Sequence, residues 1–191
     1  MPPDSTATRK RLLDAAEAEF ARYGVAGARV DRIAAEAGAN KRLIYVYYGN
    51  KQQLFDTVVT AARTRLAAAV PVHTDDLPGY AGSLFDAFVA NPEILRLTLW
   101  RSLERPAHAA ADLDLYRTKV IALRARREDG KLPATFDPVD LLAIVEALAT
   151  TWFLTSPALA SLAADGPSTV ERLAVHREAV IETVRRMLEL P

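Results

Sequence analysis

The chain of 191 residues contains no cysteine, and this absence removes several chemistries at once. Disulfide bonds, thiolate metal sites and a cysteine nucleophile are all excluded. No apolar run approaches the roughly 18 residues that a membrane-spanning helix needs. The stretch after Arg9 is amphipathic and carries Asp14 and Glu17, so it lacks the apolar core of a signal peptide. We therefore expect a cytoplasmic protein with no membrane partner.

The chain also lacks a net charge, because 24 basic residues balance 24 acidic ones. The two signs are unevenly distributed. The first 65 residues carry 11 Lys and Arg against 7 Asp and Glu, whereas the rest of the chain carries 13 against 17. A basic N-terminal part joined to an acidic body is compatible with nucleic-acid binding, although an excess of four charges can also arise by chance.

Signatures of catalysis are missing as well. The three histidines, His73, His108 and His176, are far apart and have no paired metal-ligand spacing. The sequence has neither a glycine-rich phosphate loop nor a nucleophile elbow. We expect no enzyme activity, no cofactor and no metal. A helical interaction module that has lost DNA binding remains an alternative.

What the sequence does contain is helix-forming residues, with glycine, proline and capping residues between the helical segments. The pattern predicts an all-α protein of about nine helices. They divide into an N-terminal three-helix helix-turn-helix domain (1–52) and a C-terminal helical bundle (53–191). The predicted helices are 5–23, 30–37, 41–48, 51–69, 78–90, 92–105, 109–129, 138–155 and 168–190.

Residues 37–40, Ala-Gly-Ala-Asn, form the turn of a helix-turn-helix. Gly38 supplies the positive φ of the turn, and Asn40 is expected to cap the helix that follows. The small core between the two helices is predicted to contain Ile33, Ala34, Ala37 and Ile44. Many helical pairs share such a turn, so the surrounding residues must decide its meaning.

Those surroundings resemble the N-terminal domain of the TetR family of bacterial regulators over residues 8–58. The family pattern starts with Arg, Leu-x-x-Ala-Ala, Phe and Gly, which match Arg11, Leu12, Ala15, Ala16, Phe20 and Gly24. It continues with Ile-Ala, Ala-Gly, Ile-Tyr, an aromatic pair, Lys and Leu, which match Ile33, Ala34, Ala37, Gly38, Ile44, Tyr45, Tyr47, Tyr48, Lys51 and Leu54. The resemblance implies a DNA-binding transcriptional regulator, with repression of a palindromic operator by a homodimer and release by an unknown small-molecule effector.

The resemblance also implies which residues meet DNA. Helix 41–48 would lie in the major groove, with its first residues at the base edges. The carried-over contact residues are Arg29, Asn40, Lys41, Arg42, Leu43, Tyr45, Tyr47 and Lys51. Arg29 replaces the hydroxyl residue that usually precedes the second helix. Leu43 and Val46 are unusually apolar for a helix that faces a groove, so either they contact thymine methyl groups or the helix is rotated slightly from the family norm.

Two further surfaces are expected in the C-terminal part. The last two long helices are apolar enough to form a dimer interface or an intramolecular core. The interface candidates are Leu141, Ile144, Val145, Leu148, Trp152, Val180, Ile181, Val184 and Leu188. An effector pocket, as the family has in this region, would be lined by Phe85, Phe88, Leu97, Trp100, Arg101 and Tyr116, although aromatic residues at helical spacing are more often core.

Overall fold

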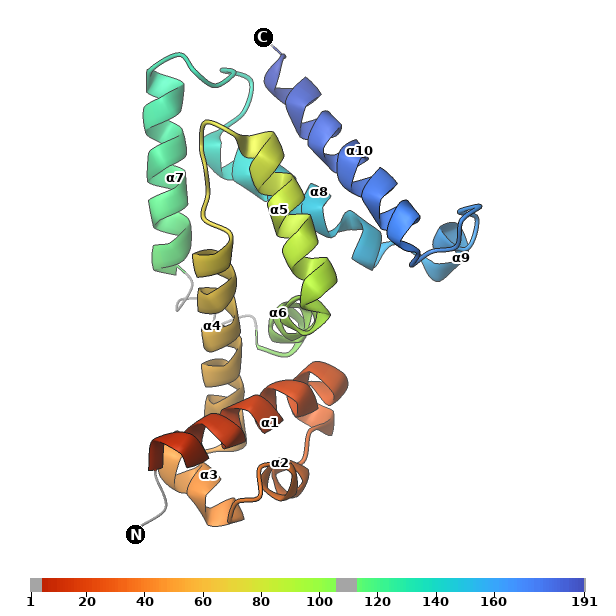
Figure 1. Cartoon of the computed structure of the whole chain (residues 1–191). Coiled ribbons are helices and arrows are strands. Elements are labelled where there is room, and N and C mark those ends of the chain that lie inside the picture. Colours follow the sequence, from red (N-terminus) through yellow and green to blue (C-terminus); the bar gives the residue numbers. More distant parts are fainter. Residues whose placement is uncertain (1–4, 106–112, 191) are drawn as a thin grey trace. The chain divides into compact units, whose positions relative to one another are not determined.

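The computed structural model describes residues 5–105 and 113–190 of the chain. In these residues the protein forms ten helices and no strand (Figure 1), which confirms the all-α prediction. The helices are α1 (Ser5–Gly27), α2 (Val30–Glu36), α3 (Lys41–Tyr48), α4 (Lys51–Ala69), α5 (Leu77–Ala90), α6 (Pro92–Glu104), α7 (Leu113–Glu128), α8 (Pro138–Leu154), α9 (Pro157–Ala160) and α10 (Val170–Leu188).

Most helix boundaries follow from local signals. The bounds of α3 and α4 are those the sequence predicts, and the Asp137 side chain caps α8 by accepting from the Val139 amide at 2.8 Å. Two details differ. Gly24 leaves the helical conformation as expected, but another turn follows it and α1 ends at Gly27. Asn91 makes no capping bond, so Pro92 alone marks the start of α6. The predicted helix start at residue 109 lies outside the described residues.

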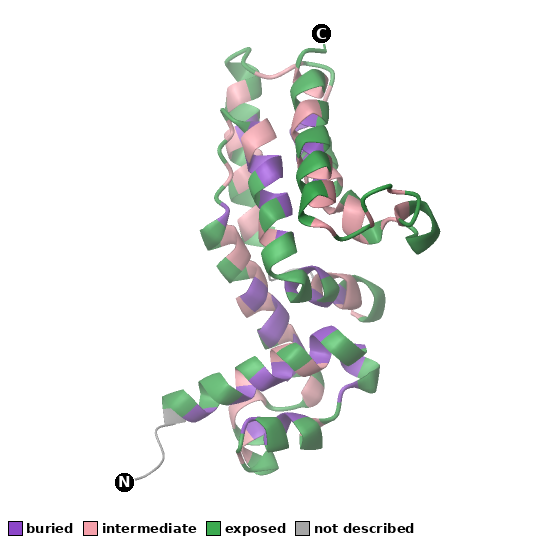
Figure 2. Ribbon diagram, turned by 45° about the vertical axis from the view of Figure 1, so that its right-hand side comes forward, coloured by how far each residue is buried: buried purple, intermediate pink, exposed green. Residues whose placement is uncertain are grey.

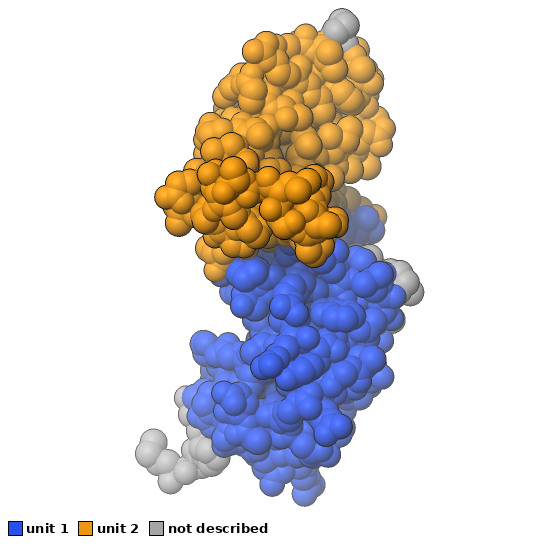
Figure 3. Space-filling model, turned by 90° about the vertical axis from the view of Figure 1, so that its right-hand side faces the viewer, with its two compact units in different colours: residues 1–66, 91–113 blue, residues 67–90, 114–191 orange. Residues whose placement is uncertain are grey.

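The chain divides into two compact units (Figure 3). Unit 1 contains residues 1–66 and 91–113, and unit 2 contains residues 67–90 and 114–191. Helix α6 therefore belongs to the same compact unit as the helix-turn-helix, although α5 separates them in the sequence. The division at residue 52 into a DNA-binding and an effector domain stays a prediction about function.

The core of unit 1 is built from one face of α1 and the inner side of α4. Leu12, Ala16 and Phe20 are fully buried on α1, as their spacing predicts (Figure 2). Phe20 meets the buried Phe55 of α4 edge-to-face, with ring centroids 5.1 Å apart. This edge-to-face contact packs α1 against α4.

The core of unit 2 lies among α5, α8 and α10. Phe85 of α5 packs against Phe153 of α8, with ring centroids 5.4 Å apart, and against the His176 ring of α10 at 5.7 Å. Gly82 permits the close approach of α10, because a Cβ atom there would lie 2.8 Å from Ile181 Cδ1. These contacts make α5 the central helix of the unit.

Candidate nucleic-acid interface

The turn between α2 and α3 has the geometry that the sequence predicts. Gly38 has φ of 57°, and the amides of Gly38 and Ala39 donate to carbonyls of α2 at 3.1 and 3.0 Å. The four predicted core residues, Ile33, Ala34, Ala37 and Ile44, are buried. Arg11 of α1 adds a contact that the pattern did not indicate, since its Nε donates to the Ala37 carbonyl at 3.1 Å. The turn is therefore held from both sides.

Helix α3 starts at a side-chain cap. The Oδ1 atom of Asn40 accepts from the Arg42 amide at 2.8 Å, which confirms the expected cap. Because this amide is satisfied locally, the first turn of α3 is ordered without DNA. The positions of Lys41 and Arg42, which follow the cap, are thereby fixed at the exposed end of the helix.

The exposed face of α3 differs slightly from the predicted contact set. Lys41, Arg42, Tyr45 and Val46 are exposed and follow the i, i+1, i+4, i+5 spacing of one helix face. Leu43 is only partly exposed, whereas Val46 is 63% exposed. Val46 is thus the more exposed of the two apolar residues expected to meet thymine methyl groups, and both contacts stay predictions.

Lys41 is already engaged in an ion pair. Its Nζ lies 2.8 Å from Oδ1 of Asp31, in the first turn of α2. The hydrogen bond to Asp31 raises the pKa of Lys41 above its ordinary value. If Lys41 binds DNA as predicted, its ammonium group has to leave Asp31, an ion pair that the sequence pattern did not reveal. Both side chains are exposed, so the exchange costs little.

The two tyrosines at the end of α3 contact the start of α1. The Tyr48 hydroxyl donates to the Arg9 carbonyl at 2.9 Å, and burial raises the pKa of that phenol. The Arg9 guanidinium lies over the Tyr47 ring, 4.8 Å from its centroid. Tyr48 is thus half-buried with its hydroxyl held by α1, and the phosphate contact predicted for Tyr47 stays a prediction.

The remaining predicted contacts lie beside the α1–α2 connection. Arg29 is exposed and its side chain does not cap α2, whereas Lys51 donates from Nζ to the Ala28 carbonyl at 3.2 Å. Each places a cation on the same side of unit 1 as the start of α2. Their expected role with phosphates is compatible with this placement and stays a prediction. A phosphate bound to Lys51 would have to replace the Ala28 carbonyl.

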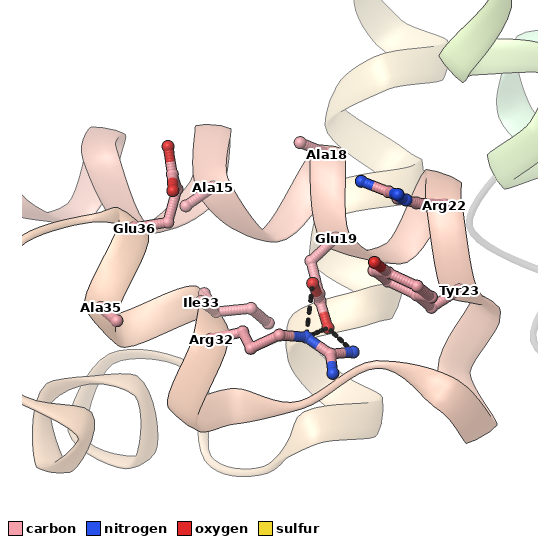
Figure 4. Close-up of a pocket in the computed structure, with 9 residues that line it drawn as sticks. All are labelled: Ala15, Ala18, Glu19, Arg22, Tyr23, Arg32, Ile33, Ala35 and Glu36. Carbon is pink, nitrogen blue, oxygen red and sulfur yellow. Dashed lines mark hydrogen bonds and ion pairs between the residues drawn. The ribbon is translucent and has the colours of Figure 1, made fainter.

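Glu19 of α1 supplies the capping interaction that Arg29 cannot. Its Oε1 accepts from the Arg29 amide at 2.8 Å. The same oxygen accepts from Arg32 Nη2 at 2.6 Å (Figure 4). Partial burial raises the pKa of Glu19, but the bonds to Arg32 and to the amide outweigh it, so the pKa lies below its ordinary value. The pair borders an open groove between α1 and α2, floored by alanines and Ile33.

We predict that Glu19→Ala lowers the free energy of unfolding of unit 1 by about 1–2 kcal/mol, because the start of α2 loses its acceptor. Glu17→Ala is the matched control, because Glu17 lies on the same helix as Glu19 and forms an ion pair with Arg65 of α4. The loss of this ion pair should cost under about 1 kcal/mol. Urea denaturation followed by circular dichroism measures both. Equal effects would contradict the capping role. The contribution of Glu19 is lost as the pH falls through its lowered pKa.

Helix α6 packs on the end of α1. The Trp100 indole donates to the Ala21 carbonyl at 3.4 Å, and Glu104 accepts from the Ala26 amide at 3.0 Å. Arg105 then forms a two-pronged ion pair with Asp56 of α4, at 2.9 and 2.8 Å. The α6 side chains of unit 1 thus hold the helix-turn-helix at its base.

The residues predicted to line an effector pocket lie in different parts of the chain. Leu97, Trp100 and Arg101 belong to α6 in unit 1, whereas Phe85, Phe88 and Tyr116 belong to α5 and α7 in unit 2. Trp100 packs against α1, and Phe85 and Phe88 both pack against Phe153. The pocket stays a prediction.

The predicted interface residues fall into two groups. Leu141, Val145, Val180 and Val184 are buried within their own chain. The other five, which keep some exposed surface, are Ile144, Leu148, Trp152, Ile181 and Leu188. The first group serves the core of unit 2, and only the second can meet a partner.

Among the described residues, no helix could cross a membrane and no group of three side chains could hold a metal.

Comparison with known protein families gives two matches along the chain. Residues 12–58 match the family of bacterial regulatory proteins of the tetR type, and residues 76–186 match the Tetracyclin repressor-like C-terminal domain. The chain belongs to the TetR family. It is a helix-turn-helix transcriptional regulator, and the role of α3 as its recognition helix stays a prediction.

Individual relatives support this assignment. The HTH-type transcriptional repressor SCO4008 of Streptomyces coelicolor is 40% identical over 97% of both chains. The HTH-type transcriptional repressor NicS of Pseudomonas putida is 30% identical over 56% of this chain and 54% of its own. The crystal structure of the regulator SCO4942 from Streptomyces coelicolor superposes with a TM-score of 0.82 and 38% identity, covering 96% of this chain and 99% of that one.

Proposed function

We propose that this TetR-family protein is a repressor that binds a palindromic operator as a homodimer and releases it when a small molecule binds unit 2. The observation that carries the proposal is the exposed face of α3, which begins at the Asn40 cap and presents Lys41, Arg42, Tyr45 and Val46. Two cations and one apolar side chain on a single helix face match guanine acceptors and thymine methyl groups in a major groove. SCO4008 and NicS are both described as transcriptional repressors, which supports repression by this protein.

Selection of bound duplexes from random DNA tests the proposal. We expect two inverted half-sites whose centres are about 34–36 Å apart, or a multiple of that distance, because a two-fold dimer presents two copies of α3. Mobility shifts of the selected site should weaken strongly between about 50 and 200 mM salt, since phosphate contacts release counterions. Recovery of no enriched sequence would overturn the proposal and favour an interaction module without DNA binding.

The dimer is expected to form through the exposed parts of α8 and α10. Ile144 of α8 is 36% exposed, whereas its neighbour Val145 is buried in unit 2. An exposed apolar residue beside the core can contact a partner without being needed for the fold. Regulators with a two-fold operator need such an interface, because one recognition helix reads only a short half-site.

We predict that Ile144→Asp raises the dimer dissociation constant at least about tenfold, because it places an unpaired carboxylate in the interface. Analytical ultracentrifugation measures the constant, and circular dichroism verifies that the helices persist. Ile121→Asp is the matched control, since Ile121 is 64% exposed on α7 and lies outside the predicted interface. A wild-type chain that stays monomeric at every concentration would contradict the prediction, as would equal effects of the two variants.

A further inference from the structure

Unit 2 contains a cluster of four polar side chains that the DNA-binding function does not use. Lys119 of α7 donates from Nζ to Glu146 Oε1 at 2.8 Å and to the Tyr80 hydroxyl at 2.9 Å. Tyr116 donates from its hydroxyl to Glu146 Oε2 at 3.1 Å. The cluster therefore joins α5, α7 and α8 through one carboxylate. We call Glu146, Tyr80 and Tyr116 the ammonium cage.

The cage holds an ammonium group by two kinds of interaction. The Lys119 Nζ atom lies 5.4 Å from the centroid of the Tyr80 ring and also 5.4 Å from that of Tyr116. The 2.9 Å contact with the Tyr80 hydroxyl places Nζ at the hydroxyl edge of that ring, so a carboxylate, a phenol oxygen and the Tyr116 ring surround the nitrogen. The two oxygens that accept from Nζ further favour a nitrogen that carries N–H bonds. The chain's own lysine thus occupies a site suited to a protonated amine.

Stability alone is a weak reason for this arrangement. The Lys119 and Glu146 side chains are only 19% and 24% exposed, and desolvation offsets much of the attraction in such a pair. Helix α7 has one buried residue, Leu123, so the cage is a main attachment of α7 to α5 and α8. A ligand that displaces Lys119 from Glu146 would loosen that attachment. The cage is therefore placed where occupancy can change the packing of unit 2.

We propose that the ammonium cage is the recognition site for a protonated primary amine on an apolar carrier, and that Lys119 is its built-in occupant. The incoming ammonium exchanges with that of Lys119 on Glu146 and Tyr80, with no covalent step. This inference rests on the proposed effector function, because it names the chemical class of that effector. An anionic ligand would meet the Glu146 carboxylate, and a quaternary ammonium could not donate to the two oxygens.

Calorimetry on the full-length protein tests the cage directly. The probe is phenethylammonium, and phenethyl alcohol and phenethyltrimethylammonium are its neutral and quaternary counterparts. Lys119→Ala should bind phenethylammonium at least about tenfold more tightly than the wild type, because no internal ammonium has to leave. Lys131→Ala is the matched control, since Lys131 pairs only with Asp129 at the surface, and it should bind as the wild type does. Neither counterpart should bind Lys119→Ala as tightly as the primary amine.

Other outcomes overturn the proposal. Equal binding of amine and alcohol by Lys119→Ala would show that the apolar carrier alone is recognised, and equal affinity of the wild type and Lys119→Ala would place the amine elsewhere. Glu146→Gln should lose the binding. If that variant does not fold, Tyr80→Phe, which removes one of the two oxygens that accept from the ammonium, should weaken the binding. The amine should also lower wild-type affinity for the selected DNA. If the protein binds no DNA at all, the proposed function fails, whereas the calorimetry still decides the cage.

Discussion

Replacing Gly24 by alanine is expected to lower the free energy of unfolding of unit 1 by about 2–4 kcal/mol. Gly24 has φ of 65° and ψ of −174°, a conformation that is almost restricted to glycine. A Cβ atom would also lie 2.9 Å from two ring carbons of Trp100. The indole is held by Ala21 and cannot move away cheaply, so α6 would be pushed off the end of α1.

Gly130→Ala separates these two causes. Gly130 has a similar φ of 68°, but no atom lies within 4 Å of the position of a Cβ atom. It should therefore cost only the backbone strain, about 1 kcal/mol. Urea denaturation measures both variants. Equal losses would show that the contact between Gly24 and Trp100 does not matter. A larger loss at Gly24, together with weaker DNA binding, would indicate that α6 supports the recognition helix.

Replacing Lys41 by alanine is expected to weaken binding to the selected operator by about 1–3 kcal/mol, as the loss of a two-pronged guanine contact would. Lys51→Ala should instead weaken binding to all sequences alike and lower the salt slope by about one, because its expected partner is a phosphate. Fluorescence anisotropy with specific and random duplexes at several salt concentrations distinguishes the two. If neither variant changes binding, α3 is not the recognition helix.

A substitution of Asp31 tests the role of Lys41 by removing its ion-pair partner. Asp31→Asn removes the ion pair that occupies Lys41 in the free protein, so DNA binding should strengthen modestly. Arg117→Ala is the control, since Arg117 is an exposed cation of unit 2 that pairs with Asp114. An effect of Arg117→Ala equal to that of Lys41→Ala would mean that only total charge matters. These variants thus test a competition that appears only in the folded chain.

Much of the candidate interface was predictable because its signals are local. Gly38 and Asn40 act within a few residues of their own positions, and the spacing of Ile33, Ala34, Ala37 and Ile44 indicates a shared core. The exposed face of α3 was predicted less well. Leu43 and Val46 are both apolar, and only the angle at which α3 packs leaves Val46 as the more exposed of the two.

The sequence by itself determined the all-α class and most helix boundaries, because capping, glycine turns and helical periodicity act over short, fixed spacings. The tertiary structure decided the longer contacts: Glu19 with the Arg29 amide, Asp31 with Lys41, and Glu146 with Lys119. These partners are separated by 10 to 27 residues. No spacing rule joins such pairs, since each depends on the direction in which two helices pack. For the same reason, the sequence indicates only that a helix stops at Gly24. The fold shows that Gly24 also leaves room for the Trp100 ring against α1.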